Sequence, residues 1–113
     1  MIAFSGCRHE SRVSEAVLRS PQVRARGRQL FVEHCALCHG ENADGQGRRR
    51  EGLTGKPADF TSASWRASAT PDGVFTVIRA GKRGTSMPAW PLLSDPEVAD
   101  LTAYVLSVQA EGP

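Results

Sequence analysis

The sequence has no long apolar segment and few aromatic side chains. Among its 113 residues, no apolar run approaches the roughly 20 residues that a transmembrane helix needs. Only 6% of the residues are aromatic, and a chain of this length forms one domain that buries proportionally little of its surface. We therefore expect one small domain whose core gains stability from a disulfide, a metal or a large apolar cofactor.

Cysteine is also scarce, since the chain contains only Cys7, Cys35 and Cys38. An odd number of thiols excludes a framework in which every cysteine is paired within the chain. At least one thiol must therefore be free, modified or used for another purpose. Only Cys35 and Cys38 share a motif, which makes this pair the first candidate for a functional site.

No stretch alternates apolar and polar residues as a half-buried strand does, and the sequence contains no internal repeat. Apolar residues recur instead at helical spacing, behind a proline or a capping residue in each case. The predicted helices cover residues 22–39, 70–80 and 94–108. We predict an all-α fold of three to five helices.

The first part of the chain shows no sustained periodicity. We predict that residues 1–21 form a flexible tail, or the remnant of a leader, and that residues 22–113 form the folded domain. Within that domain, residues 41–69 are rich in glycine, serine, threonine and aspartate, and a loop this long usually has a function.

The charges are nearly balanced, with 14 basic and 12 acidic residues and a formal net charge of +2. The basic residues are scattered and do not alternate with aromatic residues that could stack on bases, so no nucleic-acid partner is predicted. Arg79, Lys82 and Arg83 lie near the second predicted loop, where they could steer an acidic partner. A solvated loop explains them equally well.

The segment EHCALCHG, residues 33–40, places two thiols and two imidazoles in six consecutive positions. A structural zinc site needs four ligands, usually as two separated pairs, and the second pair is missing. A thioredoxin-type disulfide needs a Cys-x-x-Cys that follows a strand and opens a helix, whereas this pair ends a predicted helix.

The third interpretation of this segment includes the residue after the second thiol. Cys35, Cys38 and His39 form Cys-x-x-Cys-His, which is typical of the covalent attachment of c-type haem. We predict that both thiols form thioethers with one haem c per chain, and that the His39 imidazole binds its iron.

Met87 is the predicted sixth ligand of the iron. The chain contains two methionines, and the other is Met1. Met87 lies in a loop and not on an amphipathic helix, where methionine more often fills a core, and Pro88 restricts the backbone before it. The competing ligands are His34, which is on the tethered side, and His9, which is in the predicted tail.

These motifs resemble those of the small class I mono-haem cytochromes c of bacterial respiratory chains. The resemblance extends from about residue 27 to residue 108. Its features are, in order, GRQLF before the haem motif, CALCHG, the DGQG turn, the segment from Gly84 to Pro88 and the final helix.

This resemblance implies a cytochrome c fold wrapped around the haem. It places Gly27 and Phe31 of the first helix across from Tyr104 of the last helix. It also implies that a backbone carbonyl near Pro57 accepts a hydrogen bond from the second ring nitrogen of His39, as metal-bound histidines generally require.

The resemblance further implies an electron-transfer protein and not an enzyme. His39 and Met87 would fill both axial positions, and methionine favours a high reduction potential. We expect a monomeric one-electron carrier between unidentified redox proteins, with no catalytic residue. Two alternatives remain: a module of a larger dehydrogenase or oxidase complex, and a haem-based sensor or catalyst with a labile sixth ligand.

Covalent attachment of haem in bacteria resembles an export-linked process, which implies a location in the periplasm or otherwise outside the cytoplasmic membrane. The sequence Phe4-Ser5-Gly6-Cys7 resembles the end of a bacterial lipoprotein signal, and a lipidated Cys7 would account for the odd thiol. An unmodified cysteine in a tail is the alternative, so a membrane tether through Cys7 stays open.

Overall fold

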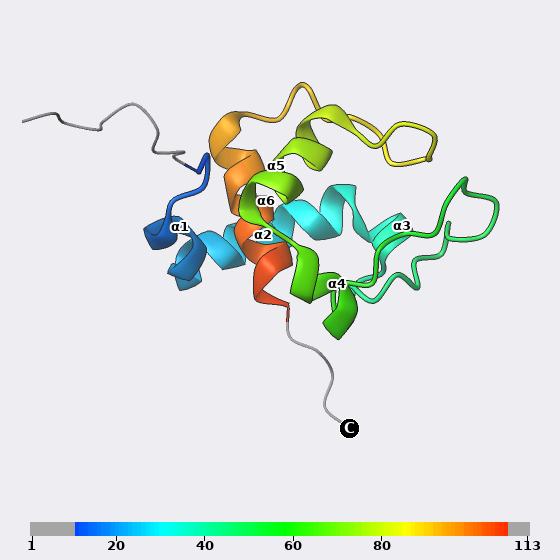
Figure 1. Ribbon diagram of the computed structural model, residues 1–113, viewed down its shortest axis with the longest axis horizontal. Helices are drawn as coiled ribbons and strands as arrows, with labels where there is room; N and C mark the ends of the chain where they lie inside the picture. The colour runs from blue at the N-terminus through cyan, green and yellow to red at the C-terminus, as the bar shows by residue number, and fades with distance from the viewer. Residues whose placement is uncertain (1–10, 109–113) are drawn as a thin grey trace, which may run out of the picture.

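The computed structural model describes residues 11–108, and this part of the chain contains six helices and no strand (Figure 1). The helices are α1 (Glu15–Arg19), α2 (Pro21–His34), α3 (Ala36–His39), α4 (Ala63–Ser68), α5 (Pro71–Ala80) and α6 (Asp95–Ser107). The all-α prediction is confirmed, although the described part holds more helices than the three to five expected. None of the helices in this part is long and apolar enough to cross a membrane.

Capping residues define where the three long helices begin. The hydroxyl groups of Ser20, Thr70 and Ser94 accept hydrogen bonds from the first turns of α2, α5 and α6, and each helix has a proline in its first turn. Such caps satisfy amide groups that have no partner within the helix. At Ser94 the bond is reciprocal, because the Glu97 carboxylate accepts from the Ser94 amide.

Helices α2 and α6 cross closely at Gly27. A β-carbon on Gly27 would lie 2.1 Å from the carbonyl oxygen of Asp100 and 2.8 Å from Cβ of Tyr104, so a larger residue would force the helices apart. One turn later, Phe31 is buried with its ring centroid 5.2 Å from that of Tyr104. The crossing implied by the family resemblance is therefore present.

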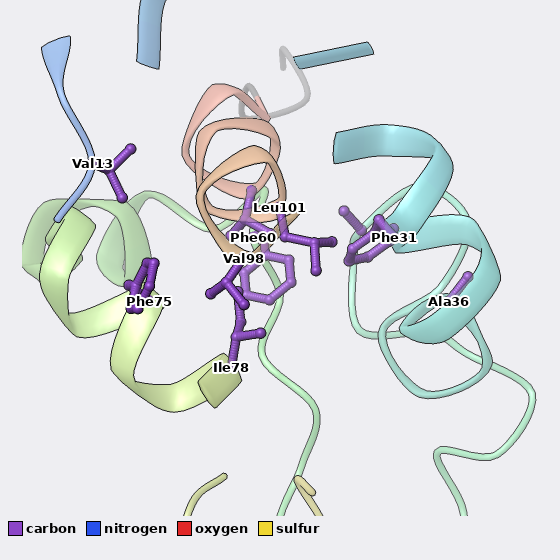
Figure 2. Close-up of a cluster of buried hydrophobic side chains, with 10 residues drawn as sticks. Val13, Phe31, Ala36, Phe60, Phe75, Ile78, Val98 and Leu101 are labelled. Atoms are coloured by element: carbon purple, nitrogen blue, oxygen red, sulfur yellow. The ribbon is translucent and has the colours of Figure 1, made fainter. Parts of the chain in front are cut away.

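The hydrophobic core lies where α6 packs against α2 and α5 (Figure 2). Val98 and Leu101 supply the α6 side, and Phe75 and Ile78 supply the α5 side. Phe60 enters the same cluster from the long loop that follows α3. The core therefore holds helices and loop in one packed unit, from which the candidate site is positioned.

Val13 and helix α1 are packed onto this core, so the described part of the predicted tail, from residue 11 on, belongs to the folded domain. Val13 is 2% exposed, and Val17 and Leu18 of α1 pack against the buried cluster. Three apolar residues over so short a segment give no periodic signal, so the packing could not be seen in the sequence. Residues 1–10 and 109–113 lie outside the described residues.

Two long loops extend from the helices on the side where α3 lies (Figure 1). One connects α3 to α4 and the other connects α5 to α6. They are joined by a reciprocal pair of hydrogen bonds: the Ser86 amide donates to the Thr54 carbonyl at 3.0 Å, and the Thr54 amide donates to the Ser86 hydroxyl at 2.8 Å. The loop that carries Met87 is thereby held to the loop that follows the cysteine motif.

Candidate functional site

The Cys-x-x-Cys-His motif forms a short turn of its own, α3. Cys35 ends α2 by donating its amide to the Phe31 carbonyl at 2.8 Å, and its backbone angles then separate α2 from α3. Gly40 ends α3 with φ of 85°, a conformation that favours glycine. Cys35 and Cys38 are both unpaired thiols and half-buried. The predicted continuous helix over residues 22–39 is therefore two helices with a break at the first thiol.

The chemistry of these thiols does not suit the two alternatives to haem. Burial raises the pKa of Cys35 to about 12, with the neighbouring Cys38 adding to the effect. Disulfide exchange requires a thiolate, and redox-active cysteines have lowered pKa values. Among residues 11–108, no three or more His, Cys, Asp and Glu side chains converge as metal ligands, so a closed zinc site has no support there.

His39 has the tautomer that a metal ligand requires. Its Nδ1 lies 3.2 Å from the carbonyl oxygen of Ala58. A carbonyl oxygen can only accept, so Nδ1 carries the hydrogen and Nε2 keeps a free lone pair. Burial lowers the pKa of His39, and the bond to Ala58 opposes this only in part. The acceptor expected near Pro57 is therefore one residue further along the chain.

The glycine-rich turn DGQG is bonded directly to the backbone of α3. The Gly45 amide donates to the His39 carbonyl at 2.7 Å, and the Gly47 amide donates to the Cys38 carbonyl at 3.2 Å. A β-carbon on Gly47 would lie 2.2 Å from the Leu37 carbonyl oxygen. The close approach explains the glycine, and the bonds fix the orientation of the turn that carries both thiols.

Aromatic rings surround the His39 side chain. The imidazole stacks on Phe60 with ring centroids 4.8 Å apart and an interplanar angle of 24°. Phe31 lies at 6.2 Å in a tilted arrangement. Trp65 of α4 packs its ring at 4.6 Å from that of Phe60. Trp65 thus packs against the ring that stacks on His39, and no signal in the sequence indicates the contact of Phe60 with His39.

Met87 lies half-buried in the loop between α5 and α6. Its carbonyl oxygen accepts from the Lys82 amide at 3.2 Å, and its amide donates to the Thr85 hydroxyl at 3.2 Å. Gly81 has φ of 75° and packs against this segment, since a β-carbon there would lie 2.9 Å from the Met87 carbonyl oxygen. The backbone of the predicted ligand is therefore well defined.

Two other residues have roles that the sequence did not reveal. Arg79, considered above as a steering charge, is bonded internally: its guanidinium donates to the carbonyl groups of Trp90 and Leu93 and to the Asp95 carboxylate. It holds the end of the second loop against α5. Trp90 packs beside His34 with ring centroids 5.1 Å apart.

The predicted site residues fit a haem c group. Two unpaired thiols and a neutral imidazole with one nitrogen free lie together at the turn of α3, and the hydrogen bonds between Ser86 and Thr54 hold the Met87 segment to the loop that follows this turn. Thioethers and a neutral histidine are what covalent haem requires. Cys7, the predicted lipidation site, and His9 lie outside the described residues.

Comparisons with known proteins agree with this chemistry. The family described as cytochrome C oxidase, cbb3-type, subunit III, matches residues 22–105. The chain is 36% identical over 89 residues to the cbb3-type cytochrome c oxidase subunit FixPc of Rhizobium leguminosarum bv. viciae, covering 78% of this chain and 29% of that protein. It is 34% identical over 99 residues to the subunit CcoP of Rubrivivax gelatinosus, covering 87% of this chain and 30% of that protein.

Among solved structures, the fold is similar to that of cytochrome CL from Methylophaga aminisulfidivorans. The TM-score is 0.64 at 21% identity, over 95% of this chain and 72% of that one. This similarity supports the fold assignment, and the cytochrome c fold implied by the sequence is confirmed. The chain spans less than a third of the length of the two oxidase subunits described above.

Proposed function

We propose that this chain, which belongs to the family of cytochrome c oxidase, cbb3-type, subunit III, is a one-electron carrier domain within a larger respiratory oxidase. The observation that carries the proposal is the neutral His39, bonded through Nδ1 to Ala58 and placed directly after two free thiols. The cofactor of cytochromes c is covalently attached haem c with its iron. Cys35 and Cys38 would hold it, and His39 and Met87 would be the axial ligands.

When bound, the haem supplies an iron that cycles between Fe(III) and Fe(II). The protein's own residues prepare the site for this role. The Ala58 carbonyl raises the basicity of the imidazole and fixes its tautomer. The rings of Phe60 and Phe31 pack against the imidazole, and the hydrogen bond of the Met87 amide to Thr85 would help to hold Met87 as the second ligand of the iron. If His39 and Met87 both bind the iron, no coordination position would remain for a substrate, so we propose no enzymatic activity for this domain.

The comparisons support the oxidase-module alternative better than an independent carrier. Both relatives are subunits of cbb3-type oxidases, and the family match covers most of the folded part of this chain. The donor and acceptor would then be redox proteins in or near that complex, and the domain would act outside the cytoplasmic membrane. An independent carrier remains the second candidate, because the chain spans less than a third of those subunits.

The two joined loops indicate what kind of surface a redox partner presents. Together, residues 48–56 and 82–86 contain six basic side chains and one acidic side chain, all exposed. They are Arg48, Arg49, Arg50, Glu51, Lys56, Lys82 and Arg83. These loops therefore carry +5 (six minus one), although the whole chain carries only +2. We call them the basic loops, and we propose that they favour an acidic partner surface.

An absorbance spectrum of the protein, oxidised and then reduced, tests the carrier function. Expression in a host that attaches haem c should give a six-coordinate, low-spin spectrum that carbon monoxide does not change. A high-spin spectrum that changes with carbon monoxide or cyanide at low concentration would contradict the proposal and support the sensor or catalyst alternative.

Purification from native membranes tests the oxidase assignment. A protein that elutes together with the other subunits of an oxidase supports the module. A protein that elutes alone, with its haem and a reversible redox change, supports the independent carrier and contradicts the module.

A further inference from the structure

We propose that Phe60 is a positioning residue that sets the rotational orientation of the His39 imidazole. This inference rests on the proposed function, since it concerns the orientation in which His39 would meet the iron. It begins from the contact between the two rings, which lie 4.8 Å apart and only 24° from parallel. The contact of His39 with Phe31 is both longer and more tilted, at 6.2 Å and 44°.

The hydrogen bond to Ala58 leaves one freedom of the imidazole unrestrained. A bond of 3.2 Å between Nδ1 and the carbonyl oxygen fixes where Nδ1 lies. The bond still allows the plane of the imidazole to rotate about the N–H···O direction, because a carbonyl oxygen accepts hydrogen bonds over a broad range of directions. A flat ring packed against the imidazole face removes that rotation, since turning the imidazole would drive its edge into Phe60.

The Phe60 ring is itself held in place firmly enough to restrain the imidazole. Its side chain is 8% exposed and belongs to the core cluster (Figure 2). Trp65 packs against it at 4.6 Å and 62°, and Phe31 at 6.2 Å and 68°. Its amide donates to the carbonyl of Ala43 at 2.8 Å. A side chain with these contacts on several sides cannot tilt without disturbing the core.

The backbone at Ala43 gives independent support for a constrained arrangement. Ala43 is fully buried and has φ of 59°, a left-handed conformation that strains a residue with a β-carbon. Its amide donates to the Gly40 carbonyl at 3.0 Å, directly after the motif, while its carbonyl accepts from Phe60. The strained residue therefore connects the end of α3 to the residue that stacks on His39.

The two contacts of His39 come from residues two apart in the same segment. Ala58 supplies the acceptor and Phe60 supplies the flat face, so a single short stretch of chain restrains both the position and the plane of the imidazole. The plane of an axial imidazole determines which iron d orbital it interacts with. Phe60 would thereby set the magnetic axes and tune the reduction potential of the bound iron.

The test compares Phe60→Leu with Phe75→Leu in the haem-loaded, oxidised protein. Both replace a buried phenylalanine of the same cluster, but the rings that contact His39 in the described part of the chain are those of Phe31 and Phe60, not Phe75. We measure the haem-methyl proton shifts by NMR, which report the imidazole plane, together with the thermal midpoint. Both variants should lose stability, while only Phe60→Leu should change the order or spread of the methyl shifts, with haem and Met87 still bound.

Trp65→Leu provides a second variant on the half-exposed neighbour of Phe60. Loss of the Trp65 ring lets Phe60 tilt, so the methyl shifts should move in the same direction by a smaller amount. An unchanged shift pattern in Phe60→Leu overturns the inference, and so does an unchanged pattern in Trp65→Leu if Phe60→Leu does not fold. A protein that binds no covalent haem would instead contradict the proposed function itself.

Discussion

At the scale of single residues, the site combines side chains whose protonation suits a covalently bound cofactor. The thiol of Cys35 is protonated because burial raises its pKa to about 12. The imidazole of His39 is neutral because burial lowers its pKa, and its hydrogen is on the nitrogen bonded to Ala58. These states follow from the packing of α3 against the loop after it, and they favour haem attachment over zinc binding or thiol exchange.

Replacing Met87 by alanine tests the predicted sixth ligand. The thioethers and His39 are untouched, so the haem should stay attached, while the open axial position should bind carbon monoxide. The weak red sulfur-to-iron band of the oxidised protein should disappear and the reduction potential should fall, since methionine favours the reduced iron.

Ser86→Ala is the matched control for this variant. Ser86 lies next to Met87, and the substitution removes only the hydroxyl that accepts from the Thr54 amide of the other loop, so the red band should remain. A Met87→Ala protein with an unchanged spectrum and potential would assign the sixth position to another residue.

At the scale of helices and loops, the sequence predicts those features that a few neighbouring residues determine, such as the start of a helix. The helices predicted to begin behind a capping residue at 70 and 94 do so, since Thr70 caps α5 and Ser94 forms a capping box with Glu97 at the start of α6. Helix α4 was missed because ASWRAS has no apolar stripe, and its position depends on the contact of Trp65 with Phe60. Only the path of the folded loop could reveal that contact.

In the site too, the sequence predicts features set by neighbouring residues and not those set by contacts between distant segments. The Cys-x-x-Cys-His motif is contiguous, so the thiols and His39 were predicted from the sequence alone. The carbonyl that orients His39 was predicted only to within one residue, because the loop between them has no local signal. Arg79 was misassigned for a similar reason, since its acceptors lie 11 to 16 residues further along the chain.

Replacing Gly47 by alanine should damage the turn that carries both thiols. The new β-carbon would lie 2.2 Å from the Leu37 carbonyl oxygen, so we expect a loss of about 3 kcal/mol in the free energy of unfolding and a lower yield of attached haem. Denaturant titration and the haem-to-protein absorbance ratio measure the two effects.

Gly52→Ala is the control in the same loop. Gly52 has φ of 84°, but a β-carbon there would have no atom within 4 Å, so only backbone strain of about 1 kcal/mol is expected, with a normal haem yield. Equal haem yields in the two variants would contradict a role for Gly47 in positioning the turn.

The capping box of α6 should make stability depend on pH. Hydrogen bonds from the Ser94 amide and side chain hold the pKa of Glu97 below its ordinary value of 4.5. A lowered folded-state pKa stabilises the fold above the unfolded-state value, and this contribution is lost as the pH falls through the lowered pKa.

Glu97→Ala should therefore lower the thermal midpoint most at neutral pH, and the difference from the native protein should shrink in acid. Glu97→Gln keeps an acceptor for the Ser94 amide without a titrating group, so it should retain more stability at neutral pH than Glu97→Ala. Thermal melts followed by circular dichroism across this range measure the effect, and a difference that does not change with pH would contradict it.

At the scale of the whole molecule, charge is distributed unevenly. The basic loops carry +5, so the rest of the chain carries −3 (+2 minus +5). Both loops lie on the side of α3, and one of them carries Met87 (Figure 1). An approaching acidic partner would therefore be oriented toward the end of the molecule that holds the proposed haem ligands.

Charge reversal in the basic loops should slow the reaction with an anionic oxidant. With hexacyanoferrate(III) as the probe, Arg83→Glu and Arg49→Glu should each lower the oxidation rate of the reduced protein at low salt, by a factor of up to about 10. Added salt should reduce the difference, because it screens exposed charges.

Arg19→Glu makes the same change of charge on α1, away from the basic loops, and should leave the rate close to that of the native protein. Stopped-flow absorbance measures all three variants. A rate that falls equally in Arg19→Glu would show that net charge, and not the basic loops, controls the reaction.

The central claim is that Cys35 and Cys38 hold a haem covalently, and extraction with acidified acetone tests it most directly. The native protein, expressed in a host that attaches haem c, should keep its colour with the precipitated polypeptide. Haem that moves into the organic phase, or a purified protein that is colourless and contains zinc, would contradict the claim.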